Sequence, residues 1–76
     1  MKAFVLITVQ GGEISEVVRS LKKVEHVVDA TMTFGVYEVI ATLEVDDINH
    51  LGRIVSRMIR PIPGITDTIT CVATEA

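Results

Sequence analysis

The sequence is poor in residues on which several functional classes depend. Its 76 residues include one cysteine, one tyrosine, two phenylalanines and no tryptophan. A single cysteine, Cys71, excludes an intrachain disulfide and a cysteine-ligated iron–sulfur cluster, and it agrees with the reducing cytoplasm, where we expect the protein to act. The scarcity of aromatic residues argues against an RNA-recognition domain, which stacks bases on aromatic side chains of its central strands.

The short motifs of catalysis and cofactor binding are missing too. No GxxxxGK[ST], CxxC, HExxH or GxSxG pattern occurs. His26 and His50 are each isolated in the sequence, so we expect neither a metal nor a cofactor. A dimeric α/β-barrel enzyme would need an acid, base or metal set that is not evident, and we therefore expect no enzyme activity.

The distribution of charged and of apolar residues argues against two kinds of partner, nucleic acids and membranes. The net charge is −3, and lysine and arginine are scattered. Direct binding to nucleic acid would need a basic stripe, so we do not expect it. No apolar run approaches the roughly 20 residues of a membrane-spanning helix, and residues 1–10 are too short for a signal-peptide core. We therefore expect no membrane association.

Aliphatic residues, by contrast, are abundant. Hydrophobic residues make up 49% of the chain, and few of them are aromatic. We expect one domain over residues 1–76, and a domain of this size buries only about 60% of its unfolded surface. The apolar surplus suggests a sheet whose second face is also covered, most simply by another copy of the chain.

The hydrophobic periods predict the element order βαββαβ. The second helix has Asp46 or Asp47 as N-cap and is stopped by Pro61. This order predicts an α+β, ferredoxin-like sandwich, with a four-stranded antiparallel sheet, two helices on one face, and dimerisation through the open face as a dimeric α/β barrel. The expected strands are 3–10, 27–34, 37–45 and 65–74, and the expected helices are 13–23 and 47–60.

Strand alternation then assigns side chains to the two faces. With a two-residue turn at Gly35-Val36, Phe34 pairs with Tyr37, Met32 with Val39 and Ala30 with Ala41. The side beneath the helices is predicted to hold these six residues with Ala3, Val5, Ile7, Val9, Val28, Leu43, Ile65, Ile69 and Cys71. The open side is predicted to hold Asp29, Thr31, Thr33, Glu38, Thr42, Glu44, Thr66, Thr68, Thr70 and Thr74, mixed with Phe4, Leu6, Val36, Ile40 and Val72.

This open side measures on the order of 500 Å², which falls in the range of surfaces that bind something. Face-to-face dimerisation is the interpretation that we favour. A solvated face made of strand-forming residues is the alternative.

Two segments carry a resemblance to a known family. Residues 35–38 (Gly-Val-Tyr-Glu) resemble the G-x-Y-D of the RAM domain, and residues 63–70 (Pro-Gly-Ile-x-x-Thr-x-Thr) resemble its P-G-V-x-x-T-x-T. RAM is the effector-binding and oligomerisation domain of the Lrp/AsnC transcription regulators, and the resemblance covers essentially the whole chain. There are two departures: Glu38 replaces the usual Asp, and no helix-turn-helix precedes the domain.

The resemblance implies a stand-alone RAM protein that senses an amino acid or a related metabolite in transcriptional or amino-acid-metabolism regulation. It also implies homodimers that assemble into ring-like oligomers, with the effector between dimers. Co-assembly with a full-length regulator would supply the missing DNA-binding part. The site residues that it implies are Gly35, Val36, Tyr37, Glu38, Thr68 and Thr70.

Chemically, glycine-turn backbone groups and threonine hydroxyls suit a zwitterion's carboxylate, and Glu38 suits its ammonium group. Each residue also has a plainer explanation: Glu38 as a charge that protects a sheet edge, Thr68 and Thr70 as ordinary strand formers, and Tyr37 as a core residue. With the strand order 4-1-3-2 that is usual for this fold, we expect Glu38 and Thr68 of one chain at opposite ends of the sheet, roughly 15–20 Å apart, so a shared ligand would need two subunits.

An ACT-like regulatory module is the alternative, because it shares the βαββαβ order. It would bind an amino acid near the first strand–helix turn, at Gly11-Gly12 in residues 10–13. Backbone N–H groups at a helix N-terminus can receive a carboxylate. A flexible strand–helix connection is the explanation of the two glycines that we favour.

Overall fold

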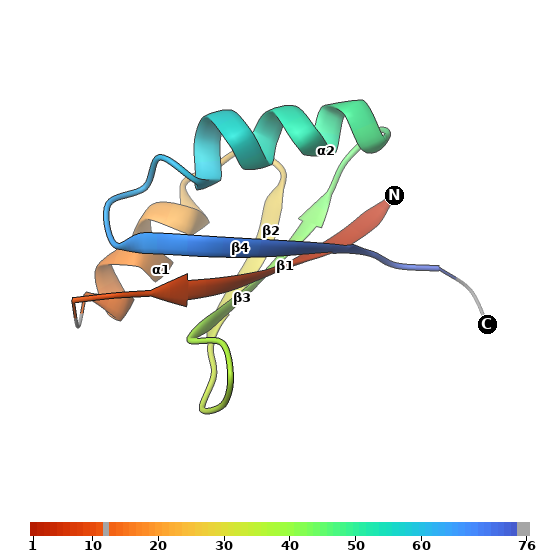
Figure 1. Cartoon of the computed structure of the whole chain (residues 1–76). Helices are drawn as coiled ribbons and strands as arrows, with labels where there is room; N and C mark the ends of the chain where they lie inside the picture. Colours follow the sequence, from red (N-terminus) through yellow and green to blue (C-terminus); the bar gives the residue numbers. More distant parts are fainter. Residues whose placement is uncertain (12, 75–76) are drawn as a thin grey trace.

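The computed structural model describes residues 1–11 and 13–74 and shows the predicted βαββαβ order (Figure 1). One four-stranded antiparallel sheet has the order β2-β3-β1-β4, and the two helices pack on one of its faces. The second helix begins as α-helix and continues as π-helix. The elements are β1 (Lys2–Val9), α1 (Ile14–Lys22), β2 (Val27–Met32), β3 (Val39–Glu44), α2 (Ile48–Ile54), η1 (Val55–Ile59) and β4 (Ile65–Val72).

β1 organises the sheet because it is antiparallel to both of its neighbours. Consequently β3 and β4 run in the same direction, and both begin beside the end of β1. Ile7 shows this directly, since it lies opposite Val39 on one side and opposite Thr68 on the other. The starts of β3 and β4 are therefore at the same end of the sheet.

The core lies between the sheet and the helices. Ala3, Val5 and Ile7 are fully buried, and so are their partners on β3. Burying one such Val or Ile side chain stabilises the fold by about 1.5–3 kcal/mol relative to leaving it exposed. The helices contribute Val17, Leu21, Leu51, Ile54, Val55 and Ile59 to this core.

The second helix begins as predicted. The N-cap is Asp47, whose carboxylate accepts a hydrogen bond of 2.8 Å from the backbone N–H of His50. This bond satisfies one of the N–H groups that have no partner within the first helical turn. The helical structure ends at Ile59, just before Pro61.

The β2–β3 hairpin differs from the prediction at its tip. The pairs Met32–Val39 and Ala30–Ala41 are confirmed, but the strands stop there. The N–H of Thr33 donates to the carbonyl of Glu38 at 2.9 Å, which closes a loop over residues 34–37. Phe34 is inside this loop and 109% exposed, so its predicted position beneath the helices is wrong.

β2 contains an irregularity that changes one further assignment. Val27 lies opposite Leu43 and Asp29 opposite Thr42, so Val28 is an extra residue in β2. A bulge of this kind interrupts the alternation of side chains. Val28 is therefore 60% exposed, and Val27 packs against the core in its place, contrary to the prediction.

A second bulge reverses the faces of β4. Thr8 lies opposite Asp67 and Val9 opposite Ile65, which leaves Thr66 unpaired; its hydroxyl donates to the carbonyl of Thr8 at 3.2 Å. Ile65 is on the helix side, as predicted. Beyond the bulge the prediction is wrong: Thr68, Thr70 and Val72 share the helix side with Ile7, Val5 and Ala3, whereas Ile69 and Cys71 lie on the open side beside Leu6 and Phe4.

The helices are too short or too polar to cross a lipid bilayer, as far as the described residues extend.

Candidate ligand-binding site

Glu38 is fixed within its own subunit. Its N–H donates to the carbonyl of Ile7 at 3.1 Å, and Oε1 accepts a hydrogen bond of 2.6 Å from the N–H of Val9. The side chain thus continues the β1–β3 ladder past its last residue pair. β3 is an inner strand, so the explanation of Glu38 as a charge guarding a sheet edge is wrong. The second carboxylate oxygen has no hydrogen-bond partner within residues 1–11 and 13–74.

The other three residues of the hairpin motif lie together in the loop that Glu38 anchors. Gly35 and Val36 are exposed at its tip, and Tyr37 is half-buried. The carbonyl of Tyr37 accepts a hydrogen bond from the Thr33 hydroxyl. This loop projects from the sheet on the side of the molecule opposite to α2 (Figure 1).

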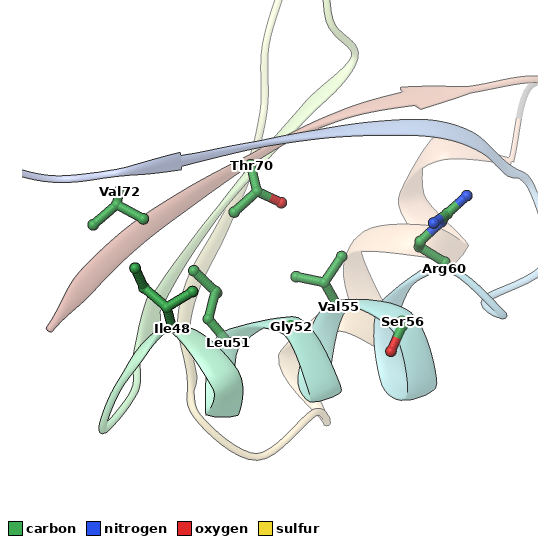
Figure 2. A pocket seen from close by; sticks show the side chains of 8 residues that line it. All are labelled: Ile48, Leu51, Gly52, Val55, Ser56, Arg60, Thr70 and Val72. Carbon is green, nitrogen blue, oxygen red and sulfur yellow. The ribbon is translucent and has the colours of Figure 1, made fainter.

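Thr70 and Thr68 lie on the helix side of β4. Thr68 is half-buried, and Thr70 is exposed in a groove of about 310 Å³ between the second helix and β4. In Figure 2, side chains of β4 and of the second helix point toward each other across this groove. We call it the α2–β4 groove; its lining residues are Ile48, Leu51, Gly52, Val55, Ser56, Arg60, Thr70 and Val72.

Glu38 and Thr68 are closer than predicted. Because β3 and β4 start at the same end of the sheet, their backbones at this level are two strand spacings apart, or about 10 Å. The prediction of opposite ends and 15–20 Å is wrong. The two side chains still do not converge: Thr68 faces the helix side, while the Glu38 carboxylate lies against the backbone of Val9. β1 separates them.

The α2–β4 groove itself was missed from the sequence, although one signal was available. Gly52 interrupts the apolar pattern of the second helix, and a Cβ atom added there would meet nothing within 4 Å. The missing side chain thus helps to open the groove. Arg60 lies at the end of the groove and forms no ion pair with any residue that the structure describes.

The two histidines are far apart in the sequence but adjacent in the fold. The rings of His26 and His50 meet edge to face, with centroids 4.4 Å apart. Nδ1 of His50 accepts a hydrogen bond of 3.0 Å from the N–H of Asp46, which holds the ring in place. No group of three or more His, Cys, Asp or Glu side chains suited to a metal ion occurs in the described part of the chain.

The glycine turn that carries the ACT-like alternative is described only in part. Gly11 has a φ of +94°, which favours glycine, but Gly12 lies outside the described residues. The alternative site at this turn therefore stays a prediction.

Comparison with known protein families matches residues 2–76 to the Lrp/AsnC ligand binding domain. No curated protein gives a significant match. Among solved structures, FFRP-DM1 is 30% identical with a TM-score of 0.89, and the similarity covers 96% of this chain and 97% of that one. The hypothetical protein PHS023 from Pyrococcus horikoshii is 29% identical with a TM-score of 0.88, covering 99% of this chain and 90% of that one.

A third structure is that of the feast or famine regulatory protein Rv3291c from M. tuberculosis, complexed with L-methionine. It is 20% identical, with a TM-score of 0.82, and the similarity covers 99% of this chain and 50% of that one. At this level of identity, the comparison shows a shared fold. The family match spans nearly every residue and agrees with both motifs and with the observed topology. The chain therefore belongs to the Lrp/AsnC ligand-binding domain family.

Proposed function

We propose that this chain is a cytoplasmic, non-enzymatic module that senses an amino acid or a related metabolite and couples its binding to oligomerisation, in transcriptional or amino-acid-metabolism regulation. The observation that carries the proposal is the match of residues 2–76 to a ligand-binding domain family. A structural neighbour complexed with L-methionine makes that amino acid the first ligand to test.

The open sheet face supports a homodimer. Its centre is apolar and lies mainly on β1 and β4, where Phe4 is opposite Cys71 and Leu6 is opposite Ile69. Two such faces, each on the order of 500 Å², would bury about 1,000 Å² in total, the lower bound for a specific interface. The reversed faces of β4 strengthen this interpretation, because Ile69 and Cys71 replace the threonines predicted there.

The proposed ligand site combines the hairpin loop of one subunit with β4 of another. The free oxygen of Glu38 would accept a hydrogen bond from the ammonium group of the ligand, and the Thr70 hydroxyl and the backbone at Gly35 would hold its carboxylate. Val36, Tyr37 and Thr68 complete the proposed set. Two subunits are needed because β1 separates the Glu38 and Thr68 side chains of one chain.

Thermal-shift measurements against the twenty amino acids, with light scattering alongside, test this function. A ligand at 100 times its Kd stabilises the folded state by about 2.7 kcal/mol, which is readily detected in a domain of this size. Thr70→Val keeps the shape of the side chain but removes its hydroxyl, and it should weaken the shift. A flat screen, with no change in scattering for any amino acid, would contradict the proposal.

Co-assembly with a full-length regulator is the second part of the proposal. The chain matches 50% of Rv3291c, and that part of Rv3291c has the same fold as this chain. Two domains of the same fold would be able to form a mixed assembly. Pull-down with the tagged chain, followed by sizing, should recover a regulator that carries a DNA-binding domain. Recovery of this chain alone, with and without ligand, would restrict its function to self-assembly.

A further inference from the structure

The α2–β4 groove is a long apolar depression built entirely from one subunit. Ile48 and Arg60 lie at its two ends, and the twelve residues of helix between them span about 18 Å (Figure 2). Leu51 and Val55 are almost fully buried along it, whereas Ile48 and Val72 are 64% and 37% exposed. A concave, mainly apolar surface with few polar groups is typical of a small-molecule site.

One end of the groove carries a positive charge that has no partner. Arg60 forms no ion pair within the described part of the chain. Residues 48–66 hold three of the seven basic residues, Arg53, Arg57 and Arg60, and none of the ten acidic ones. The local charge is thus opposite to the net charge of the chain, and it favours a negatively charged ligand at this end.

The lining also excludes one kind of ligand head group. None of the residues that line the groove is acidic, so none of their side chains can pair with an ammonium group. The guanidinium of Arg60, by contrast, can donate two parallel hydrogen bonds to a single carboxylate. The groove therefore suits an acid that has no amino group.

The volume of the groove limits the size of such an acid. It is about 310 Å³, whereas a cavity of about 150 Å³ holds a benzene molecule, which has six non-hydrogen atoms. By this comparison the groove accommodates about twelve non-hydrogen atoms. The length of the groove favours an extended chain over a compact ring system.

We propose that the α2–β4 groove binds a small apolar monocarboxylate, of the class of medium-chain fatty acids. Its carboxylate pairs with Arg60, and its tail lies along Val55 and Leu51 toward Ile48. Each methylene group that leaves water for this apolar surface adds to the affinity. A ligand of this size, with ordinary binding energy per atom, reaches a Kd on the order of 0.1–1 mM.

This site goes beyond the proposed amino-acid site and does not depend on it. The groove needs no second subunit and no residue of the hairpin loop, and its ligand lacks the ammonium group that Glu38 is proposed to bind. Thr70 belongs to both sets of residues, so the test leaves Thr70 unchanged.

Decanoate, which has twelve non-hydrogen atoms, is the probe. Equilibrium dialysis of labelled decanoate against the wild-type protein should give one bound molecule per chain. At about five times its Kd, decanoate should raise the Tm by about 4–8 °C. Butyrate shares the head group but lacks the tail, and decylamine shares the tail but carries the opposite charge. Neither should displace labelled decanoate at the same concentration.

Two variants test the two ends of the ligand. Gly52→Phe fills the groove from a helix position with open space around it and should abolish binding. Its matched control is Met58→Phe, at an exposed position of the same helix outside the groove. Arg60→Gln should weaken binding about tenfold, and Arg57→Gln, which removes the same charge outside the groove, should leave the Kd unchanged. Arg60→Lys should restore part of the affinity.

Several results would overturn the proposal. These are a wild type that binds no decanoate at millimolar concentration, a Kd for both Gly52→Phe and Arg60→Gln equal to that of the wild type, or displacement by decylamine. The same measurements keep the two proposals apart. Glu38→Gln should leave the decanoate Kd unchanged. Decanoate binding together with a flat amino-acid screen would contradict the proposed function alone, and an amino-acid shift without decanoate binding would contradict the groove site alone.

Discussion

The Glu38 carboxylate occupies the position that a strand carbonyl would hold opposite Val9. Its 2.6 Å bond to the Val9 N–H keeps that donor satisfied where the β2–β3 loop departs from the sheet. Charge-assisted bonds of this kind are roughly twice as strong as neutral ones. Glu38 therefore sets the geometry of the loop, in addition to the ligand contact that we propose for it.

Glu38→Ala should destabilise the fold, because it leaves the Val9 N–H without its protein acceptor. We expect a loss of about 1–2 kcal/mol in the free energy of unfolding, measured by urea denaturation. Glu38→Gln retains an oxygen acceptor and should recover part of the loss. A value for Glu38→Ala equal to the wild type would mean that the contact to Val9 contributes nothing to stability.

The residue scale also shows where sequence reasoning succeeded and where it could not. Two motifs selected the six candidate site residues, whose part in binding stays a prediction, and the structure places Gly35, Val36 and Tyr37 together in the loop that Glu38 anchors. The exposure of Phe34 was harder to predict, because its sequence pattern is that of a strand residue. The hydrogen bonds that place it in a loop join Thr33 to Tyr37 and Glu38, four and five positions along the chain. Apolar character alone does not distinguish a buried residue from an exposed one.

At the scale of elements, the stability of the second helix depends on its N-cap residue, Asp47, and on Gly52 in its interior. Asp47→Ala removes the acceptor for the His50 N–H and should cost about 1 kcal/mol. Asp47→Asn keeps an oxygen at the same place and serves as the matched control, with both measured by urea denaturation. Equal destabilisation by the two variants would assign the effect to lost charge instead of the lost cap.

Gly52→Ala should have the opposite sign. The position is helical, its φ is not positive, and an added Cβ has open space. Alanine is favoured over glycine in a helix interior by about 1 kcal/mol, so the Tm should rise by about 4–8 °C. A fall in Tm in a scanning calorimetry experiment would show that the groove cannot accommodate even a methyl group.

The strands show the limit of arguments from alternation. Element order and approximate bounds followed from the hydrophobic periods, and the inner register of the hairpin was predicted correctly. The two bulges, at Val28 and Thr66, could not be predicted because both residues are ordinary strand formers. Each bulge moved the neighbouring side chains to the face opposite to the one that strict alternation predicts.

At the scale of the whole molecule, the arrangement of β3 and β4 decides which residues can share a site. The antiparallel pairing of both with β1 places their starts at the same end of the sheet. The expected strand order 4-1-3-2 is confirmed, but the expected distance between Glu38 and Thr68 did not take these strand directions into account. The open face that remains is apolar at its centre. The burial of this face in a dimer can be tested by substitutions that leave the core unchanged, because the side chains of the face point away from the helices.

Leu6→Glu places a charge at the centre of that face and leaves the helix side unchanged. Light scattering should show monomers, since an unpaired charge in an apolar interface is strongly unfavourable. Met58→Glu, at an exposed apolar residue of the second helix on the other side of the sheet, is the matched control and should remain dimeric. Retention of the dimer by Leu6→Glu would move the interface elsewhere.

The thiol of Cys71 reports on the same face. It is exposed in the single chain and lies opposite Phe4, so a face-to-face dimer would cover it. A thiol reagent such as Ellman's should react several-fold faster with the Leu6→Glu variant than with the wild type. Equal rates would indicate that the open face is not buried in solution.

The Thr66 bulge has a consequence for how variation along β4 should be interpreted. A strand with polar and apolar residues in alternation encodes two surfaces, and its phase relative to β1 determines which surface meets the solvent or a partner. In β4 that phase is set by one unpaired residue. Loss or gain of a single residue before Asp67 would move the side chains that line the groove to the open face, and those of the open face to the groove. Homologous chains that differ there by one residue would therefore present different surfaces to their partners, although their side chains are nearly the same.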